Sequence, residues 1–221
     1  QMVRIHVPDI IVSDVMMPRM NGYKLCKTIK EDINISHIPV ILLTARDDRQ
    51  SQISGYKNGA DGYLSKPFEV EMLMELIRNR LKNREYTKKR YLNAGLIPTP
   101  EESTISLTDE TFLIKLNSII QENIENSNLG IQFICQEVGL GRSSLYNKLK
   151  ALTGMGANEY ISKLRIEKAI TLISGTDMPF SEIAEKTGFT TPSYFSTAFK
   201  QYTGETPSQY KERKKKGLAG K

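Results

Sequence analysis

The sequence is poor in cysteine and histidine and has no long apolar run, the features that mark disulfide-rich, metal-binding and membrane-spanning proteins. It contains no tryptophan, two cysteines and two histidines among 221 residues. Cys26 and Cys135 lie far apart in helix-like patterns, which predicts two reduced core thiols rather than a disulfide. His6 and His37 are isolated, so we expect them at the surface and expect no metal site around them. No apolar run approaches the ~20 residues that span a bilayer and no signal-peptide pattern is present, which favours a cytoplasmic protein without direct membrane contact.

Positive charge is concentrated in the C-terminal part of the sequence. The net charge is +6, and residues 128–221 hold 14 basic and 8 acidic side chains, whereas residues 85–127 hold 4 and 7. An excess of basic side chains suits a polyanionic partner, and a solvated basic face would give the same composition.

Residues 10 to 82 alternate between strand-like and helix-like patterns. Buried strands are predicted within 9–14, 38–45 and 61–68, and helices within 22–32, 51–60 and 69–84. This βαβαβα order predicts a parallel sheet. Two prolines and small polar residues at 93–108 indicate a linker, and after it only helices are predicted, the first capped by Thr108.

Three polar side chains stand at successive predicted strand ends. They are Asp14, Thr44 and Lys66. Ligands of an open parallel sheet bind outside the carboxyl ends of its strands, so we expect these groups to converge. A carboxylate can act as nucleophile toward a phosphoryl group, and a hydroxyl and an ammonium can bind the phosphoryl oxygens. Each residue alone could be an ordinary polar loop residue.

The stretches "SDVMMPRMNG", "ILLTA" and "YLSKPF" resemble the receiver domain of two-component response regulators over residues 3 to about 82. The resemblance implies that Asp14 is the phosphoacceptor, Thr44 the switch hydroxyl and Lys66 the phosphate-binding lysine. It also implies that Tyr63 is the aromatic residue that rotates on activation.

The magnesium site that the resemblance implies is incomplete in this sequence. In a receiver the sheet order is 2-1-3-4-5, and the first strand ends in an acidic pair that holds Mg²⁺ with the phosphoacceptor and a backbone carbonyl, here that of Met16. The sequence starts just before the third strand, and Asp9 is the only acidic residue before Asp14. We therefore expect no Mg²⁺ bound in this chain, inefficient phosphorylation by acetyl phosphate, and an exposed sheet edge at Ile10–Ser13. The family's Lys-Pro bond, Lys66–Pro67 here, is expected to be cis.

Two segments of the basic region repeat at an offset of 50 residues. "SSLYNKLKALTG" begins at Ser143 and "SYFSTAFKQYTG" begins at Ser193. Their apolar positions are spaced i, i+4, i+7, which predicts the buried side of a helix: Leu145, Leu149 and Leu152 in one copy, Phe195, Phe199 and Tyr202 in the other. Upstream, "ICQEVG" matches "IAEKTG", with Gly139 and Gly188 at the turn, and downstream Tyr160 matches Tyr210. Helix, glycine-containing turn and helix with a polar outer side form the helix-turn-helix pattern.

The segment 108–213 resembles the AraC-type DNA-binding domain, most closely in "IAEKTGFTTPSYFSTAFKQYTGETPSQYK". The resemblance implies two groups of DNA contacts. The base-reading candidates are Ser143, Tyr146, Asn147, Ser193, Ser196 and Thr197. The phosphate-contact candidates are Arg142, Lys148, Lys150 and Lys200. Longer polar residues are common in the family at the positions of Ser193 and Thr197, so the second unit is expected to discriminate less between bases.

The sequence thus predicts an α/β region with a partial, flavodoxin-like doubly wound parallel sheet that lacks its first two strands, followed by an all-α region. The expected boundaries are 1–84 for the partial receiver, 85–107 for a linker and 108–215 for the double helix-turn-helix domain. This combination resembles the C-terminal part of hybrid two-component regulators, in which sensor, kinase, receiver and DNA-binding domain share one polypeptide.

The expected function is transcription regulation through promoter DNA, controlled in the intact receiver by phosphorylation of Asp14 with Mg²⁺. The expected partners are double-stranded DNA, a histidine kinase domain and a second copy of the chain. An alternative is a DNA-binding module whose partial receiver serves only as a dimerisation surface. A hydrolase is not expected, because the sequence offers no His-paired nucleophile, metal cluster or second catalytic carboxylate.

Overall fold

The computed structural model describes residues 2–45, 59–93 and 106–218. The chain forms two compact units. The first comprises Gln1–Ile114 with Ser143–Gly154, and the second comprises Lys115–Arg142 with Met155–Lys221. The short α1 (Met2–His6), which was not predicted, precedes the first strand.

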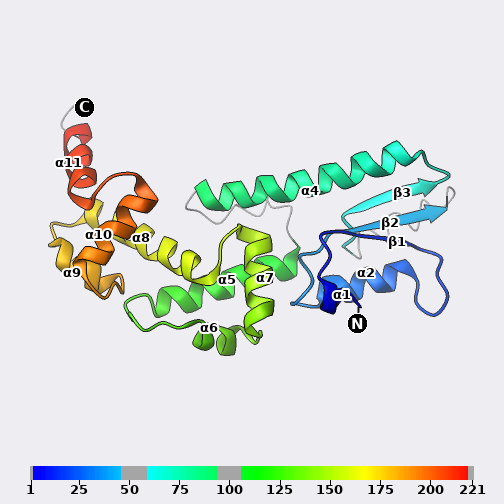
Figure 1. Ribbon diagram of the computed structural model, residues 1–221, viewed down its shortest axis with the longest axis horizontal. Helices are drawn as coiled ribbons and strands as arrows, with labels where there is room; N and C mark the ends of the chain where they lie inside the picture. Colours follow the sequence, from blue (N-terminus) through cyan, green and yellow to red (C-terminus); the bar gives the residue numbers. More distant parts are fainter. Residues whose placement is uncertain (1, 46–58, 94–105, 219–221) are drawn as a thin grey trace. The chain divides into compact units, whose positions relative to one another are not determined.

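The first unit contains a three-stranded parallel sheet, as predicted. The strands β1 (Ile11–Asp14), β2 (Val40–Ala45) and β3 (Gly62–Lys66) follow one another in the order β1-β2-β3. Asp14 pairs with Leu43, and Ala45 pairs with Lys66. All three strands point the same way, so their carboxyl ends meet at one edge of the sheet (Figure 1).

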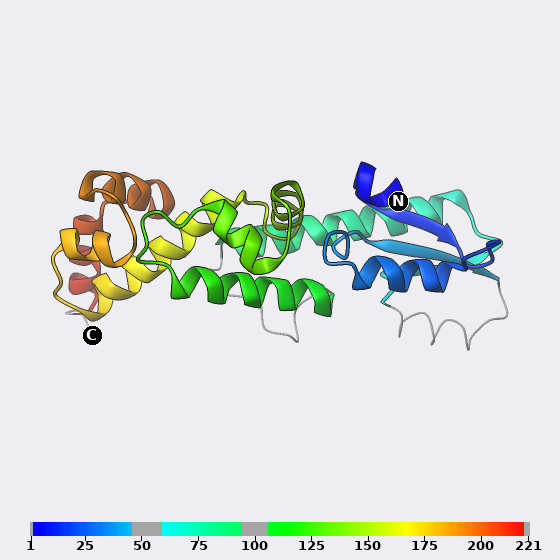
Figure 2. The same cartoon turned by 90° about the horizontal axis from the view of Figure 1, so that it is seen from below.

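Helices cover both faces of this sheet. Helix α2 (Gly22–Glu31) packs Cys26 and Ile29 against Val40 and Leu42 of β2. Ile41, which points to the opposite face, lies beside Gly62 and Leu76 of α4 (Val70–Asn93). Figure 2 shows α2 running along the strands. The helix predicted within 51–60 lies almost entirely outside the described residues.

The boundaries of two helices differ from the prediction. Helix α4 continues to Asn93, so residues 85–93, which were assigned to the linker, are helical. Helix α5 (Leu107–Glu122) begins one residue before the predicted cap. The cap is Ser106, whose Oγ accepts from Asp109 N at 3.2 Å and donates to Asp109 Oδ2 at 2.8 Å. Thr108 instead donates its hydroxyl to Lys30 O at 2.9 Å.

The second unit is helical. Its core cluster is formed by α8 (Ala157–Gly175), α9 (Phe180–Lys186), α10 (Pro192–Thr203) and α11 (Pro207–Leu218). Thr191 caps the start of α10, where its side chain accepts a hydrogen bond from Tyr194 N, and Pro192 lies in the first turn. Phe195 and Phe199 are fully buried, and the Phe199 and Tyr210 rings lie 5.6 Å apart. The other copy of the repeat is divided between the units: α6 (Ile131–Val138) belongs to the second unit, and α7 (Arg142–Thr153) belongs to the first apart from Arg142.

The predictions for the cysteines and histidines had different outcomes. Cys26 and Cys135 are buried free thiols, as predicted. His6 is exposed, but the prediction for His37 is wrong, because His37 is buried at 7% exposure. Burial and the neighbouring Lys148 ammonium lower the pKa of His37 to about 4. No helix in the described ranges combines the length and the apolar content that a bilayer crossing requires.

Candidate phosphoacceptor site and DNA-reading helices

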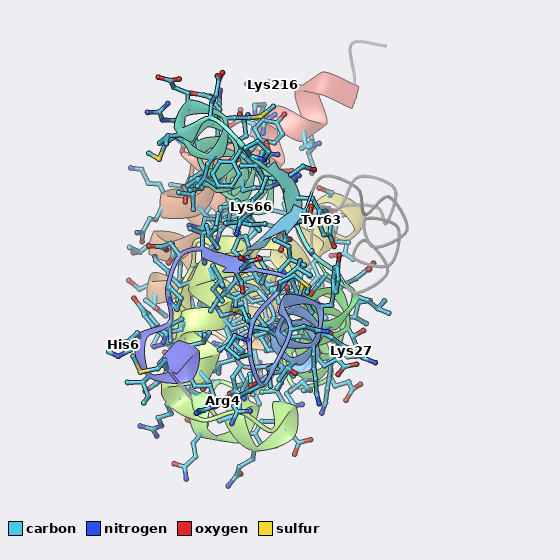
Figure 3. The ribbon with its side chains drawn as sticks, turned by 90° about the vertical axis from the view of Figure 1, so that its right-hand side faces the viewer. Arg4, His6, Lys27, Tyr63, Lys66 and Lys216 are labelled. Atoms are coloured by element: carbon cyan, nitrogen blue, oxygen red, sulfur yellow. The ribbon has the colours of Figure 1, made fainter. Side chains whose placement is uncertain are left out.

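The strand-end residues meet at the carboxyl edge of the sheet. Lys66 Nζ, at the end of β3, donates to Asp14 Oδ2 at the end of β1, and Met16 N donates to Asp14 Oδ1 at 3.1 Å. Figure 3 looks onto this edge, with Lys66 and Tyr63 labelled on β3. The hydrogen bond from Lys66 is the main cause that holds the pKa of Asp14 below its usual value. Asp14 is therefore an ionised carboxylate beside a cation.

Thr44 lies between these two residues on the central strand. Its neighbours in sequence, Leu43 and Ala45, pair with Asp14 and Lys66. Thr44 is 2% exposed, and its Oγ1 has no hydrogen-bond partner among the described residues. A buried hydroxyl without a partner is costly unless it binds something that arrives later. This arrangement leaves a nucleophilic carboxylate, a hydroxyl donor and an ammonium at one edge, which suits a bound phosphoryl group.

The remaining receiver predictions concern Met16, Tyr63 and the Lys66–Pro67 bond. The side chain of Met16 is 80% exposed, Tyr63 is half-buried, and the Lys66–Pro67 bond is cis, as expected. The described residues contain no group of three or more metal-ligating side chains. Asp14 and the Met16 carbonyl therefore do not by themselves fit a Mg²⁺ site, which needs near-octahedral oxygen coordination.

The Asn21–Gly22 pair stands at the start of α2. Asn21 Oδ1 accepts from Lys24 N at 2.9 Å and so caps α2. A Cβ on Gly22 would lie 2.5 Å from Asp14 O and 2.9 Å from Val15 Cα. Gly22 is thus required because the start of α2 packs directly against the backbone of Asp14 and Val15.

Helix α7 presents the polar side that the repeat predicted. Leu145, Leu149 and Leu152 are buried, whereas the predicted DNA contacts Arg142, Ser143, Tyr146, Asn147 and Lys150 are exposed. The structure corrects the prediction for Lys148, which is fully buried beside Asp109. Because Lys148 lies on the inward side of α7, its ammonium cannot reach a phosphate on the outer side.

Helix α10 repeats this arrangement with one correction. Ser193, Thr197 and Lys200 are exposed and Ser196 is half-buried. Thr197 Oγ1 donates to Ser193 O at 3.1 Å, which leaves its methyl group and lone pairs for contacts. Tyr202 was predicted to be buried like Leu152 but is 38% exposed. Its hydroxyl donates to Glu167 Oε1 of α8 at 3.2 Å and so holds the end of α10 on α8.

One exposed aromatic residue on α10 was not among the predicted contacts. Tyr194 is 56% exposed at the start of the helix, and its ring meets the Phe189 ring edge-on at 5.8 Å. The repeat aligns it with Ser144, a small residue, so the alignment gave no signal for it. We refer to α7 and α10 as the two reading helices below.

Comparison with known proteins gives two family matches in different parts of the chain. Residues 1–78 match the response regulator receiver domain, and residues 134–213 match a helix-turn-helix domain. The chain is 30% identical over 162 residues to "Probable transcriptional regulator ycf29" of Pyropia yezoensis, which covers 68% of this chain and 73% of that protein. The chain belongs to the response regulator family. In this chain, a receiver region is followed by an AraC-type helix-turn-helix region.

Two further similar proteins match either most of the chain or its C-terminal part. "Histidine kinase P4" of Formosa agariphila is 43% identical over 208 residues, which is 94% of this chain but 15% of that protein. The chain therefore spans a small part of that relative. The C-terminal domain of AraT, a response regulator from Geobacillus stearothermophilus, has 31% sequence identity and a TM-score of 0.44, covering 46% of this chain and 84% of that domain.

Proposed function

We propose that this response regulator binds promoter DNA through α7 and α10 and regulates transcription as part of a two-component system. The observation that carries the proposal is the matched construction of the two reading helices. Each buries an apolar side and exposes a side of hydroxyl, amide and basic groups within a basic region. Such a helix can enter the major groove of a duplex and contact base edges and phosphates.

Different side chains have different roles in this proposal. The exposed Tyr146, Asn147 and Ser193 are assigned to base edges, because amide and hydroxyl groups distinguish base pairs in the major groove. Arg142, Lys150 and Lys200 are assigned to phosphates, whose contacts position the protein without reading sequence. Ser143, Ser196 and Thr197 are assigned to base edges as well.

Two variants of the first reading helix separate these roles. We expect Arg142→Ala to weaken binding to all duplexes alike and to reduce the slope of log K against log salt by about 1. We expect Asn147→Ala to change the preferred base at one position, with a loss of discrimination of about 1–3 kcal/mol. Fluorescence anisotropy with a selected duplex and its single-base variants measures both.

The result that would remove Asn147 from the base readers is a uniform loss across all base variants. Asn158→Ala is the matched control, since Asn158 is an exposed asparagine at the start of α8, outside both reading helices. It should bind every duplex with the wild-type affinity.

We propose that phosphorylation of Asp14 controls this DNA binding in the intact receiver, with Mg²⁺ ligands additional to Asp14 and Met16. The nucleophile, Thr44 and Lys66 already stand together, which supports this assignment. The same proposal includes a histidine kinase partner, which can share one polypeptide with this region, a homodimer and a cytoplasmic location. It includes no enzymatic activity.

The phosphoryl control has its own test. In the polypeptide that carries the whole receiver, acetyl phosphate with Mg²⁺ should label the wild type, not Asp14→Asn, and should raise DNA affinity only in the wild type. If Asp14→Asn and wild type respond identically, the rival function gains support, in which the receiver region is only a dimerisation surface.

A further inference from the structure

The inward side of the first reading helix bonds to the receiver region of the first unit. Lys148 of α7 donates to Ser36 Oγ at 2.7 Å and also to the Asp109 carboxylate. Ser36 Oγ in turn donates to Asp109 Oδ1 at 2.7 Å. Ser36 and Lys148 are fully buried, and Asp109 is 2% exposed. A serine of the receiver region is thus a hydrogen-bond partner of a reading helix.

The receiver segment that contains Ser36 (residues 30–38) is fixed at several points. Lys30 Nζ donates to Ser36 O at 3.2 Å and to Ile38 O at 3.0 Å, and it pairs with Asp61 at 2.8 Å. Lys30 O accepts from Thr108 at 2.9 Å, which adds a second link to the start of α5. These contacts of Lys30 tie the receiver segment to the end of α2.

The opposite end of α2 touches the phosphoacceptor. Gly22 N donates to Val15 O at 3.0 Å. A Cβ on Gly22 would lie 2.5 Å from Asp14 O, so α2 can start this close to Asp14 only with glycine at its first position. The 10 residues of α2 form one continuous helix about 15 Å long. One helix therefore joins the backbone of Asp14 to the receiver segment behind α7.

We propose that the receiver segment is an output surface that positions α7, with Ser36 and Lys148 as positioning residues for the first half of the DNA site. A shift of α2 at Asp14 would move Ser36, and Lys148 would carry that movement into the reading helix. This inference rests on the proposed function, since it names the route by which the receiver acts on DNA binding. It also gives Lys148, which is buried away from DNA, a role other than a phosphate contact.

The test compares wild-type chain and Ser36→Ala on a duplex selected from a random library. Two further duplexes are made from it, each with the sequence of one half-site scrambled. The first half-site is the one whose binding is weakened by Asn147→Ala. We expect Ser36→Ala to weaken binding to the complete duplex about three- to tenfold, because two buried hydrogen bonds are lost. Binding to the duplex with only the second half-site should be unchanged. Thr28→Ala, on the exposed side of α2, is the control and should match the wild type throughout.

A double-mutant cycle tests the route along α2. Gly22→Ala pushes the start of α2 away from Asp14, so it should lower affinity for the first half-site in the wild-type background and have little further effect with Ser36→Ala. If Gly22→Ala does not fold, Thr108→Val takes its place, because it removes the hydroxyl bonded to Lys30. It should likewise lower affinity for the first half-site in the wild-type background and have little further effect with Ser36→Ala.

Each outcome of these measurements decides something. Equal affinities of wild type and Ser36→Ala on every duplex would overturn the inference and leave the proposed function standing. Absence of sequence-specific binding by the wild type would overturn the proposed function itself. A loss of equal size on all duplexes with a lowered melting temperature would show a general loss of folding, and this also overturns the inference.

Discussion

Asp109→Asn is expected to destabilise the first unit by about 3–5 kcal/mol, because it leaves the buried Lys148 ammonium without its counter-charge. Lys148 is fully buried. It also donates to the Ser36 hydroxyl, and its Nζ lies 5.1 Å from the centre of the Phe112 ring, but neither of these groups carries a negative charge. The Asp32 carboxylate attracts the ammonium more weakly than Asp109 does. The measurement is urea unfolding followed by circular dichroism, which gives the change in the free energy of unfolding.

Asp177→Asn is the matched control for this prediction. Asp177 pairs with Lys211 at 3.3 Å, but its side chain is 91% exposed, so the same chemical change should cost less than about 1 kcal/mol. The double variant Asp109→Leu with Lys148→Met removes both charges and should recover most of the loss. Equal effects of Asp109→Asn and Asp177→Asn would contradict the account of a buried pair.

The Asp109–Lys148 pair also predicts a pH dependence. Burial alone would raise the pKa of Asp109, but the Lys148 ammonium and the hydroxyl donors outweigh it and the net shift is downward. The folded pKa lies below the unfolded value of about 3.9. The stability that this group contributes is therefore present above that value and is lost as the pH falls through the folded pKa.

Gly188→Ala is expected to destabilise the second unit by about 3 kcal/mol or more, because two costs add at this position. The backbone φ of Gly188 is +71°, a left-handed conformation that favours glycine. An added Cβ would also lie 2.2 Å from Ile124 O and 2.8 Å from the Arg165 guanidinium. The Ile124 carbonyl belongs to the backbone and cannot move aside like a flexible side chain, so the α9–α10 turn itself must shift.

The other copy of the repeat supplies the control. Gly139 has a φ of +75°, but a Cβ there would meet nothing within 4 Å. Gly139→Ala should therefore show only the cost of the left-handed conformation, about 1–2 kcal/mol. Thermal unfolding of both variants measures the difference. Equal losses would show that the close approach at Gly188 has no energetic effect.

Regular spacing made the strands and reading helices predictable from sequence. The apolar positions Leu145 and Leu149 and their matches Phe195 and Phe199 are buried as the i, i+4 pattern required. The parallel sheet followed equally from the alternation of strands and helices. Local spacing sets these features, so no knowledge of distant contacts was needed.

The predictions that were wrong depend on contacts between distant parts of the sequence. Lys148 looks like any basic residue on a polar helix, and only the approach of Asp109 and Ser36 accounts for its burial. His37 is likewise buried in the folded chain near residues distant in sequence, among them Lys148 and Asp109. Tyr202 occupies a buried position of the repeat, yet its hydroxyl reaches Glu167 and keeps one side of the ring exposed. A single sequence shows none of these pairings.

The central claim, that two reading helices bind one duplex, is tested most directly by hydroxyl-radical footprinting of the wild-type chain on a selected duplex across a salt series. We predict two protected segments about 10 base pairs apart, with protection that weakens steeply as salt increases. Asn147→Ala should reduce protection of one segment and spare the other. A single protected segment, or protection that salt does not change, would contradict the claim.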